Sequence, residues 1–516
     1  MVLFILEFKW HDLNTPLSIC IWLLSIILIK IISHSSERFT IVPDSALLIL
    51  VGFAAGSIMD RFWPDEIYLH PAYYLLPIQK ISHLNVIIDA EKKIADFFFL
   101  YLLPPIALDA GYALPYQAFF ENFGTIILYA VMGTLWNIIS VGFILFMASP
   151  FFSISLPWVD LFLFSTFISA VDPVAVLSVF EEINVNRLLY ICVFGESLLN
   201  DAVTIVIYHA LAAMAKIGPE NLETEDFIKA LISFFLVSFG GILIGIVGAI
   251  LTGLATKYSN DQQVLQPLIC LLIPYLSYLV AESVHFSGIL AIVLCGLMMK
   301  QYLAGNLSKQ SLVTTSYFLK TLSTSCEAII FVFLGLSTVS KKHDWDSVFI
   351  ATTLLACLVC RFTGTYFLSC LANSGRRQKI NLVDQFIMAY GGLRGAICYG
   401  LVMTLDKDAV VAKEMFTSTT IIVILTTVFL QGATIRPLVR LLDVEIEPDN
   451  QVTLVEHVIS DVRDDIMEGI EAVAGIQGPK WFRQKFSHFN NNYILPCMVR
   501  NQRTRADELL AICDKR

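Results

Sequence analysis

Two carboxylates and an amide occur inside a stretch of the chain that is otherwise apolar. The stretch covers residues 188–213 and contains Glu196, Asn200 and Asp201. It is long enough to cross a bilayer, whose hydrocarbon core needs about 20 residues. A charged side chain near the middle of such a helix costs roughly 2.5–3.5 kcal/mol on insertion scales, so these groups should face a protein interior or a water-filled cavity. Polar groups in this setting are typical of ion and proton pathways.

A third carboxylate stands beside a helix-breaking residue. Asp172 precedes Pro173 in another apolar stretch, near residues 159–180. Proline removes a backbone donor and clashes with the preceding turn, so we expect this helix to break or kink. A broken helix frees backbone carbonyls next to the Asp172 carboxylate, and transporters with discontinuous helices bind cations in such places. The pattern therefore favours a cation site.

A second interruption is predicted late in the chain, where residues 390–396 hold three glycines around Arg394. Arg361 and Glu327 also fall inside apolar stretches. A buried charge is costly without a partner, so some of these acids and bases should pair. One acid can then remain free to bind a cation or a proton, which compete for the same oxygens.

Composition places the whole chain in a membrane. The chain has 516 residues, of which 56% are hydrophobic and 15% are charged. A soluble protein carries about 25% charged residues. We therefore expect an all-α polytopic membrane protein. The sequence holds no GxGD, HExxH or GxSxG motif, so we expect neither an enzyme nor a protein with a cofactor. The net charge of −10 argues against nucleic acid as a partner.

Apolar windows predict about thirteen transmembrane helices within residues 1–440. They lie near residues 16–33, 43–59, 94–112, 124–148, 159–180, 187–213, 227–255, 264–284, 286–302, 313–339, 346–373, 382–404 and 413–439. The two interrupted spans occupy corresponding places in two halves, which indicates an inverted-repeat transporter fold with discontinuous helices crossing at mid-membrane. Spans one to six and eight to thirteen would be the repeats, with span seven as the linker.

Positive loop residues predict the orientation. Basic residues gather on one side of the predicted spans: Arg38, Arg376, Arg377, Lys379 and Arg440. We take that side as cytoplasmic, which places the N-terminus outside and the C-terminus in the cytoplasm.

The residues from 441 to 516 differ from the rest and form a short cytoplasmic tail. Between 452 and 474, apolar residues recur at spacings of three and four in an acidic segment, which predicts an amphipathic helix. Its apolar face needs a partner groove or a membrane domain to cover it. Residues 480–505 are basic with interleaved aromatics. Such a stretch attracts anionic lipid of the inner leaflet, although a merely solvated segment is equally consistent with it.

Several motifs together resemble the animal sodium/proton exchangers. The chain resembles this group of the monovalent cation/proton antiporter superfamily, also called solute carrier family 9, from about residue 20 to 440. Its Phe180-Glu181-Glu182 sequence looks like the plasma-membrane branch. The resemblance is carried, in order, by residues 99–111, 133–137, 170–177, 180–182, 195–203 and 390–396.

The resemblance implies a function and an ion site. It implies electroneutral exchange of external Na⁺ for internal H⁺ by elevator-type alternating access, regulating intracellular pH and cell volume at the plasma membrane. Asp201 would carry the exchanged ion, and Asp172 would help shape the Na⁺ site. Asn200 would occupy the place of a second Asp in electrogenic relatives.

The resemblance also implies supporting residues and partners. Glu196 would pair with Arg361, and Arg394 would stabilise the second interruption. A homodimer is implied, and so is a calcineurin-B-like EF-hand protein bound to the 452–474 helix. Four residues match positions that affect amiloride-type inhibitors: Phe99, Leu100, Glu282 and Gly288.

Cys398 and Tyr399 depart from the family pattern, which has smaller or apolar residues there. The tail is also shorter than the regulated tails of many members. Other functions remain open: exchange of K⁺ or another monovalent cation for protons, a cation channel, or an intramembrane protease that uses Asp172 and Asp201.

Overall fold

The structure is a computed structural model, and the elements it contains within the residues it describes are all helices. These residues are 43–62, 95–218, 222–259, 262–339, 343–376, 379–407, 410–444 and 494–500, together with isolated positions elsewhere. Within the same ranges, eight helical segments are long and apolar enough to cross a membrane. The predicted all-α membrane class is therefore confirmed. The predicted span at 16–33 lies almost wholly outside the described residues, so the count of thirteen stays a prediction.

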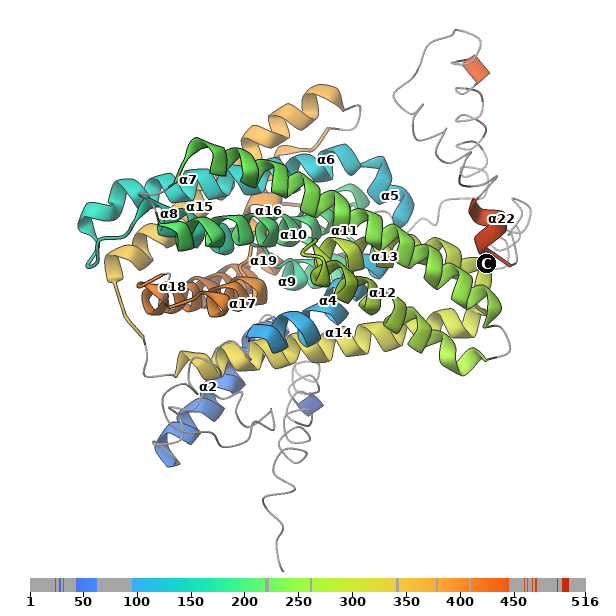
Figure 1. Ribbon diagram of the computed structural model, residues 1–516, viewed down its shortest axis with the longest axis horizontal. Helices are drawn as coiled ribbons and strands as arrows, with labels where there is room; N and C mark the ends of the chain where they lie inside the picture. The colour runs from blue at the N-terminus through green and yellow to red at the C-terminus, as the bar shows by residue number, and fades with distance from the viewer. Residues whose placement is uncertain are drawn as a thin grey trace, which may run out of the picture.

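One group of helices packs mainly against itself, and we call it the scaffold group. Its helices gather toward the right and the lower edge of Figure 1. Its members are α2 (Asp44–Phe62), η3 (Phe98–Leu102), α4 (Leu103–Ala113), α11 (Thr224–Tyr258), α12 (Gln266–Ser283), α13 (Gly288–Asn306) and α14 (Lys309–Thr338).

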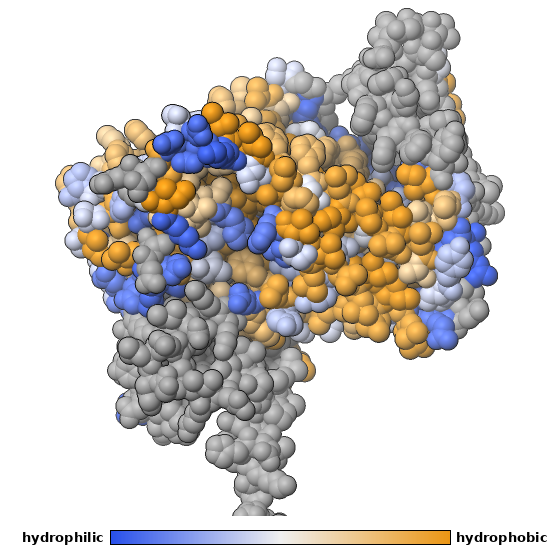
Figure 2. Space-filling model, in the orientation of Figure 1, coloured by the Kyte–Doolittle hydropathy of each residue, from blue (hydrophilic) through white to orange (hydrophobic). Residues whose placement is uncertain are grey.

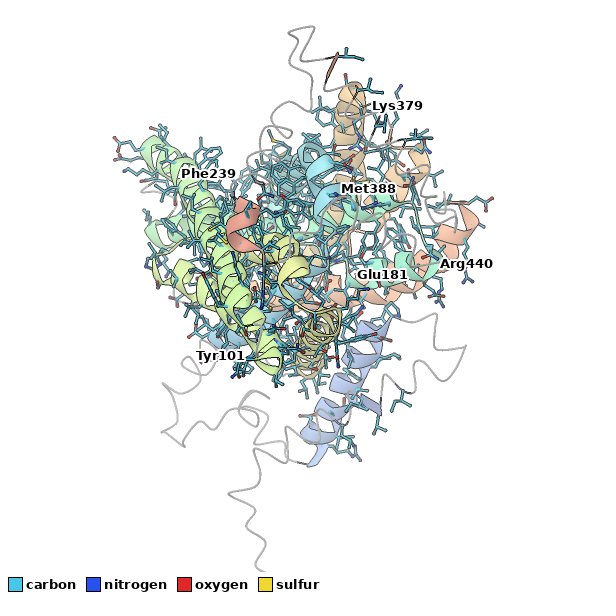
Figure 3. The ribbon with its side chains drawn as sticks, turned by 90° about the vertical axis from the view of Figure 1, so that its right-hand side faces the viewer. Tyr101, Glu181, Phe239, Lys379, Met388 and Arg440 are labelled. Atoms are coloured by element: carbon cyan, nitrogen blue, oxygen red, sulfur yellow. The ribbon has the colours of Figure 1, made fainter. Side chains whose placement is uncertain are left out.

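The remaining long helices form a second body, the crossing group, which contains the two interruptions. Its members are η4 (Leu128–Gly133), α7 (Thr134–Ala148), α8 (Trp158–Ile168), α9 (Val174–Ile183), α10 (Arg187–Ile217), α15 (Ser347–Gly375), α16 (Leu382–Tyr390), α17 (Ala396–Thr404), α18 (Lys413–Thr426), η7 (Thr427–Gln431) and α19 (Gly432–Leu441). Phe239 of α11 and Arg440 of α19 lie on opposite flanks of the molecule (Figure 3). Short helices α5 (Tyr116–Glu121) and α6 (Phe123–Ile127) connect α4 to η4.

Glycine allows the scaffold helices to approach backbone to backbone. A Cβ at Gly245 of α11 would lie 2.5 Å from the carbonyl oxygen of Ala291 in α13. A Cβ at Gly111 of α4 would lie 2.5 Å from the carbonyl oxygen of Val293, also in α13. Because α13 is held this closely on two sides, the scaffold group is a rigid platform.

The outer face of the scaffold group is apolar. Figure 2 shows hydrophobic side chains spread over the region of α11 to α13. On α11, exposed hydrophobic side chains recur mainly at spacings of three and four residues, among them Phe227, Ile228, Leu231, Ile232, Phe235, Leu236, Phe239, Leu243, Val247 and Leu251. A face of this size suits lipid or another apolar surface rather than water.

Part of the tail docks onto the scaffold group. Helix α22 (Leu495–Met498) packs beside α11, and Met498 and Val499 are buried with Tyr302. Asn306 joins the two parts, since its Nδ2 donates to the Met498 carbonyl at 3.0 Å and its Oδ1 accepts from the Arg500 amide at 2.9 Å. The predicted 452–474 helix lies outside the described residues apart from isolated positions.

Candidate ion-binding site

The two interruptions meet inside the crossing group. The first lies between α8 and α9, at residues 169–173, and the second lies between α16 and α17, at residues 391–395. The Asp172 amide donates to the Leu393 carbonyl at 2.8 Å, so the two non-helical segments are in direct contact. Gly395 has no room for a side chain, because a Cβ there would overlap the Asp172 side chain. The two breaks therefore fix the position of Asp172.

The carbonyls that the first break frees are occupied by donors from the protein. Arg394 Nη1 donates to the Ser169 carbonyl at 3.0 Å and to the Ala170 carbonyl at 3.3 Å. The Ser197 hydroxyl donates to the Val171 carbonyl. The end of a helix leaves carbonyls without partners and carries partial negative charge, so a buried guanidinium is a suitable cap. Arg394 thereby stabilises the first break from within the second.

At this crossing, Asp172 and Asp201 are acidic residues that line a cavity, whereas Glu196 does not line it. Both carboxylates line a cavity of about 680 Å³ that extends to Lys300 and Lys320. Asp172 Oδ1 accepts a hydrogen bond from the Val174 amide at 3.1 Å, at the start of α9. Within the described part of the chain, the Asp201 carboxylate accepts no hydrogen bond and forms no ion pair; its close charged neighbour is Asp172. A carboxylate in this state can bind a proton or a small cation from the cavity.

Glu196 and Arg361 form an ion pair on the other side of α10 from the cavity. Both side chains are buried, and Arg361 Nη2 also donates to the Met388 carbonyl at 3.2 Å. Removing one member of such a pair leaves an uncompensated buried charge. The pair joins α10 to α15 and α16, and its charges cancel before any ion is bound.

Asn200 lies behind the site rather than in it. Its Nδ2 donates to Thr134 Oγ1 at 2.7 Å, its Oδ1 accepts from Thr204 Oγ1 at 3.4 Å, and the side chain is fully buried. Asn200 is not among the residues that line the cavity. Successive residues on a helix point about 100° apart, so Asn200 faces α7 while its neighbour Asp201 faces the cavity.

The donor set suits a hard cation. Carboxylate oxygens and water are the ligands that such ions prefer. Among the described residues no group of three or more His, Cys, Asp or Glu side chains could hold a metal ion, so a resident transition metal has no site there.

The comparisons with known proteins identify the family. A family model described as "Sodium/hydrogen exchanger, transmembrane" matches residues 23–441. The chain belongs to the sodium/hydrogen exchanger family. The resemblance inferred from the motifs is thereby confirmed, and the exchanger is a multi-pass membrane protein.

Similar exchangers occur in worms and mammals. The probable Na(+)/H(+) antiporter nhx-9 of Caenorhabditis elegans is 42% identical over 507 residues, which is 98% of this chain and 72% of that protein. Sodium/hydrogen exchanger 2 of Oryctolagus cuniculus is 42% identical over 501 residues, which is 96% of this chain and 59% of that protein. Among solved structures, the sodium proton antiporter MjNhaP1 from Methanocaldococcus jannaschii matches with a TM-score of 0.59 at 19% identity, over 84% of this chain and 99% of that one. The fold of this exchanger is therefore that of an antiporter.

The four inhibitor-site candidates gather in a separate place on the scaffold group. Tyr278 donates to the Phe99 carbonyl at 2.8 Å, and Tyr275 donates to the Leu100 carbonyl at 2.9 Å. These carbonyls belong to η3, a π-helical stretch at the start of α4. Glu282 Oε1 accepts from the Gly288 amide at 3.1 Å. None of the four candidates lines the cavity.

Sequence reasoning missed several residues that hold the site together. Ser197 and Cys398 donate to carbonyls of the first break, and Thr134 anchors Asn200. Cys398 carried a signal, since it departs from the family pattern just after the second break. Ser197 lies four residues before Asp201 on the same face of α10, and that spacing could have indicated its place beside the first break.

Proposed function

We propose that this exchanger is an electroneutral Na⁺/H⁺ antiporter of the plasma membrane, taking in external Na⁺ and releasing internal H⁺ to regulate intracellular pH and cell volume. The observation that carries the proposal is the Asp201 carboxylate, which has no protein partner among the described residues and lies at a cavity of about 680 Å³ beside Asp172. Of the other charged groups at the crossing, Glu196 is paired with Arg361, and Arg394 donates to backbone carbonyls.

The charge balance supports electroneutrality. One Na⁺ and one H⁺ compete for the Asp201 oxygens, and each neutralises the carboxylate equally well. Asn200 adds no charge to the cycle. If Asp172 keeps the same protonation state throughout, the loaded site carries the same charge in both directions.

The packing supports an elevator-type movement. Both carboxylates belong to the crossing group, and the contacts between this group and the scaffold group are much sparser than those within each group. A sparse interface between two well-packed bodies is the usual place for rigid-body sliding or rocking. Movement of the crossing group would carry Asp172 and Asp201 past the scaffold group and expose them on alternate sides.

The partners that we propose use surfaces outside the ion site. The exchanger would form a homodimer, and an EF-hand protein of the calcineurin-B type would cover the 452–474 helix. Four isolated apolar positions of that helix are helical and exposed: Ile459, Val462, Ile466 and Ile470. Residues 480–505 would contact anionic lipid through the part that is not docked on α11.

Proton flux in reconstituted vesicles tests the function. We expect an imposed gradient of Na⁺ to move protons in the opposite direction, at the same rate whether or not the membrane voltage is clamped. A rate that depends on the clamped voltage would contradict electroneutral exchange. Flux driven by K⁺ but not by Na⁺ would instead establish a K⁺/H⁺ exchanger, and single-channel currents would establish a channel.

A further inference from the structure

Cys398 links the two interruptions beside the ion site. It is the third residue of α17, and its side chain is fully buried. Its Sγ donates to the Ala170 carbonyl at 3.3 Å, so a residue just after the second break holds a carbonyl of the first. Ala170 and Cys398 both line the cavity that contains Asp172 and Asp201.

Among the carbonyls of Ser169, Ala170 and Val171 in the first break, that of Ala170 accepts the largest number of hydrogen bonds. A carbonyl oxygen has two lone pairs. The two lone pairs of the Ala170 carbonyl accept hydrogen bonds from Arg394 and from Cys398. The Ser169 carbonyl accepts one hydrogen bond, from Arg394. The Val171 carbonyl also accepts one, from Ser197. The thiol therefore occupies the second lone pair of the Ala170 carbonyl, in a residue that lines the cavity.

We propose that Cys398 is a positioning residue that determines the cation affinity of the site. Its thiol keeps the Ala170 carbonyl from serving as a ligand and so reduces the number of protein oxygens available to the cation. This inference rests on the proposed antiport function and extends it to the ligand set.

Keeping the Ala170 carbonyl away from the cation affects pH dependence, because a carbonyl oxygen does not bind a proton in the physiological pH range. Protons displace a cation from carboxylate oxygens, since both bind the same atoms. A carbonyl ligand would hold Na⁺ regardless of pH and would weaken that competition. A thiol is a weak donor, so it can occupy the carbonyl without fixing it as strongly as a hydroxyl would.

Substitutions at position 398 test the proposal through the Michaelis constant. In vesicles containing the full chain, we expect C398A to lower the apparent KM for Na⁺ by about three- to tenfold, as one additional polar contact would. The maximal rate should fall less, and acidification should raise the KM less steeply than in the parent. C398S keeps a donor and should return the KM to the parental value.

Cys270→Ala is the matched control. Cys270 is also fully buried, but it lies on α12 in the scaffold group, far from either break in sequence. We expect the parental KM for this variant. If C398A is recovered in too small an amount, Cys398→Gly carries the same prediction because it also lacks a donor.

An unchanged or raised KM in the donor-free variant would overturn the proposal, and so would a C398S variant that behaves like C398A. An equal drop in the KM of Cys270→Ala would overturn it as well. These outcomes are distinct from failure of the antiport function, in which the parent itself would show no flux driven by Na⁺.

Discussion

Asn200 and Asp201 are neighbours in the sequence, yet their side chains have different surroundings. Asp201 faces the cavity, whereas Asn200 is held by Thr134 behind it. A carboxylate at position 200 would thus enter a buried, hydrogen-bonded place and not the ion pathway. The effect of residue 200 on transport should act through the packing of α10 against α7.

Asn200→Asp tests this placement. The change removes the Nδ2 donor and buries a carboxylate, so we expect a loss of about 1–3 kcal/mol in the free energy of unfolding. Exchange that survives should stay insensitive to voltage. Thermal unfolding of the purified protein and flux under voltage clamp provide the measurements. A variant as stable as the parent whose flux follows the membrane voltage would contradict the placement of Asn200 outside the pathway.

At the scale of single helices, Asp346 caps α15 just outside the membrane-spanning segment. Its Oδ1 accepts from the Val348 amide at 2.9 Å and its Oδ2 from the Ser153 hydroxyl at 2.6 Å. Burial raises the pKa of this carboxyl, but the hydrogen bonds to Ser153, Phe349 and Val348 outweigh burial, and the pKa lies below its usual value. The ionised form is therefore the one that stabilises the fold.

Asp346→Ala should lower the free energy of unfolding by about 1 kcal/mol at neutral pH, as the loss of a helix cap does. Because the folded pKa is lowered, the contribution of the ionised carboxylate is complete above the unfolded pKa of about 4. It is lost as the pH falls through the folded pKa. Unfolding measured from neutral to acid pH should show the parent and the variant converging. A difference that grows on acidification would contradict this account.

The docked tail provides a second test at this scale. Asn306→Ala removes the hydrogen bonds that connect α13 to Met498 and Arg500. We expect residues 494–500 to detach more often, and limited proteolysis to cut there several times faster. Gln310→Ala, at an exposed position of α14, is the control. An unchanged cleavage rate in Asn306→Ala would show that this residue does not hold the tail.

The sequence predicted where the helices are interrupted, but it did not predict the contacts between the interrupted segments. Proline at 173 and the glycines of 390–396 indicated both interruptions, because their effects on a helix are local. The Ala170–Cys398 contact joins segments that are far apart in the chain, and no local pattern encodes it. The π-helical stretch at Phe98–Leu102 also depends on tertiary partners, since tyrosines of α12 bind its carbonyls.

At the scale of the whole molecule, the scaffold and crossing groups meet at Gly400 of α17. A Cβ at Gly400 would overlap the ring of Phe98, which belongs to η3 in the scaffold group. The proposed sliding of the two bodies would need clearance at this contact, since packed interiors do not yield to added volume.

Gly400→Leu should therefore lower the maximal exchange rate far more than it changes the KM for Na⁺. Adding Phe98→Ala should restore much of the rate by returning space to the interface. Gly124→Ala is the control, because nothing lies within 4 Å of a Cβ at that position. A Gly400→Leu variant with the parental maximal rate would contradict movement across this interface.

In the proposed mechanism, Asp201 is the group that releases a proton and binds Na⁺ in its place. The most direct test is proton flux driven by a Na⁺ gradient in vesicles containing Asp201→Asn, beside the parent and the exposed control Glu225→Gln on α11. We predict flux at the level of protein-free vesicles for Asp201→Asn, with thermal unfolding close to that of the parent, and parental flux for Glu225→Gln. Robust Na⁺-driven flux by a folded Asp201→Asn variant would contradict the central claim.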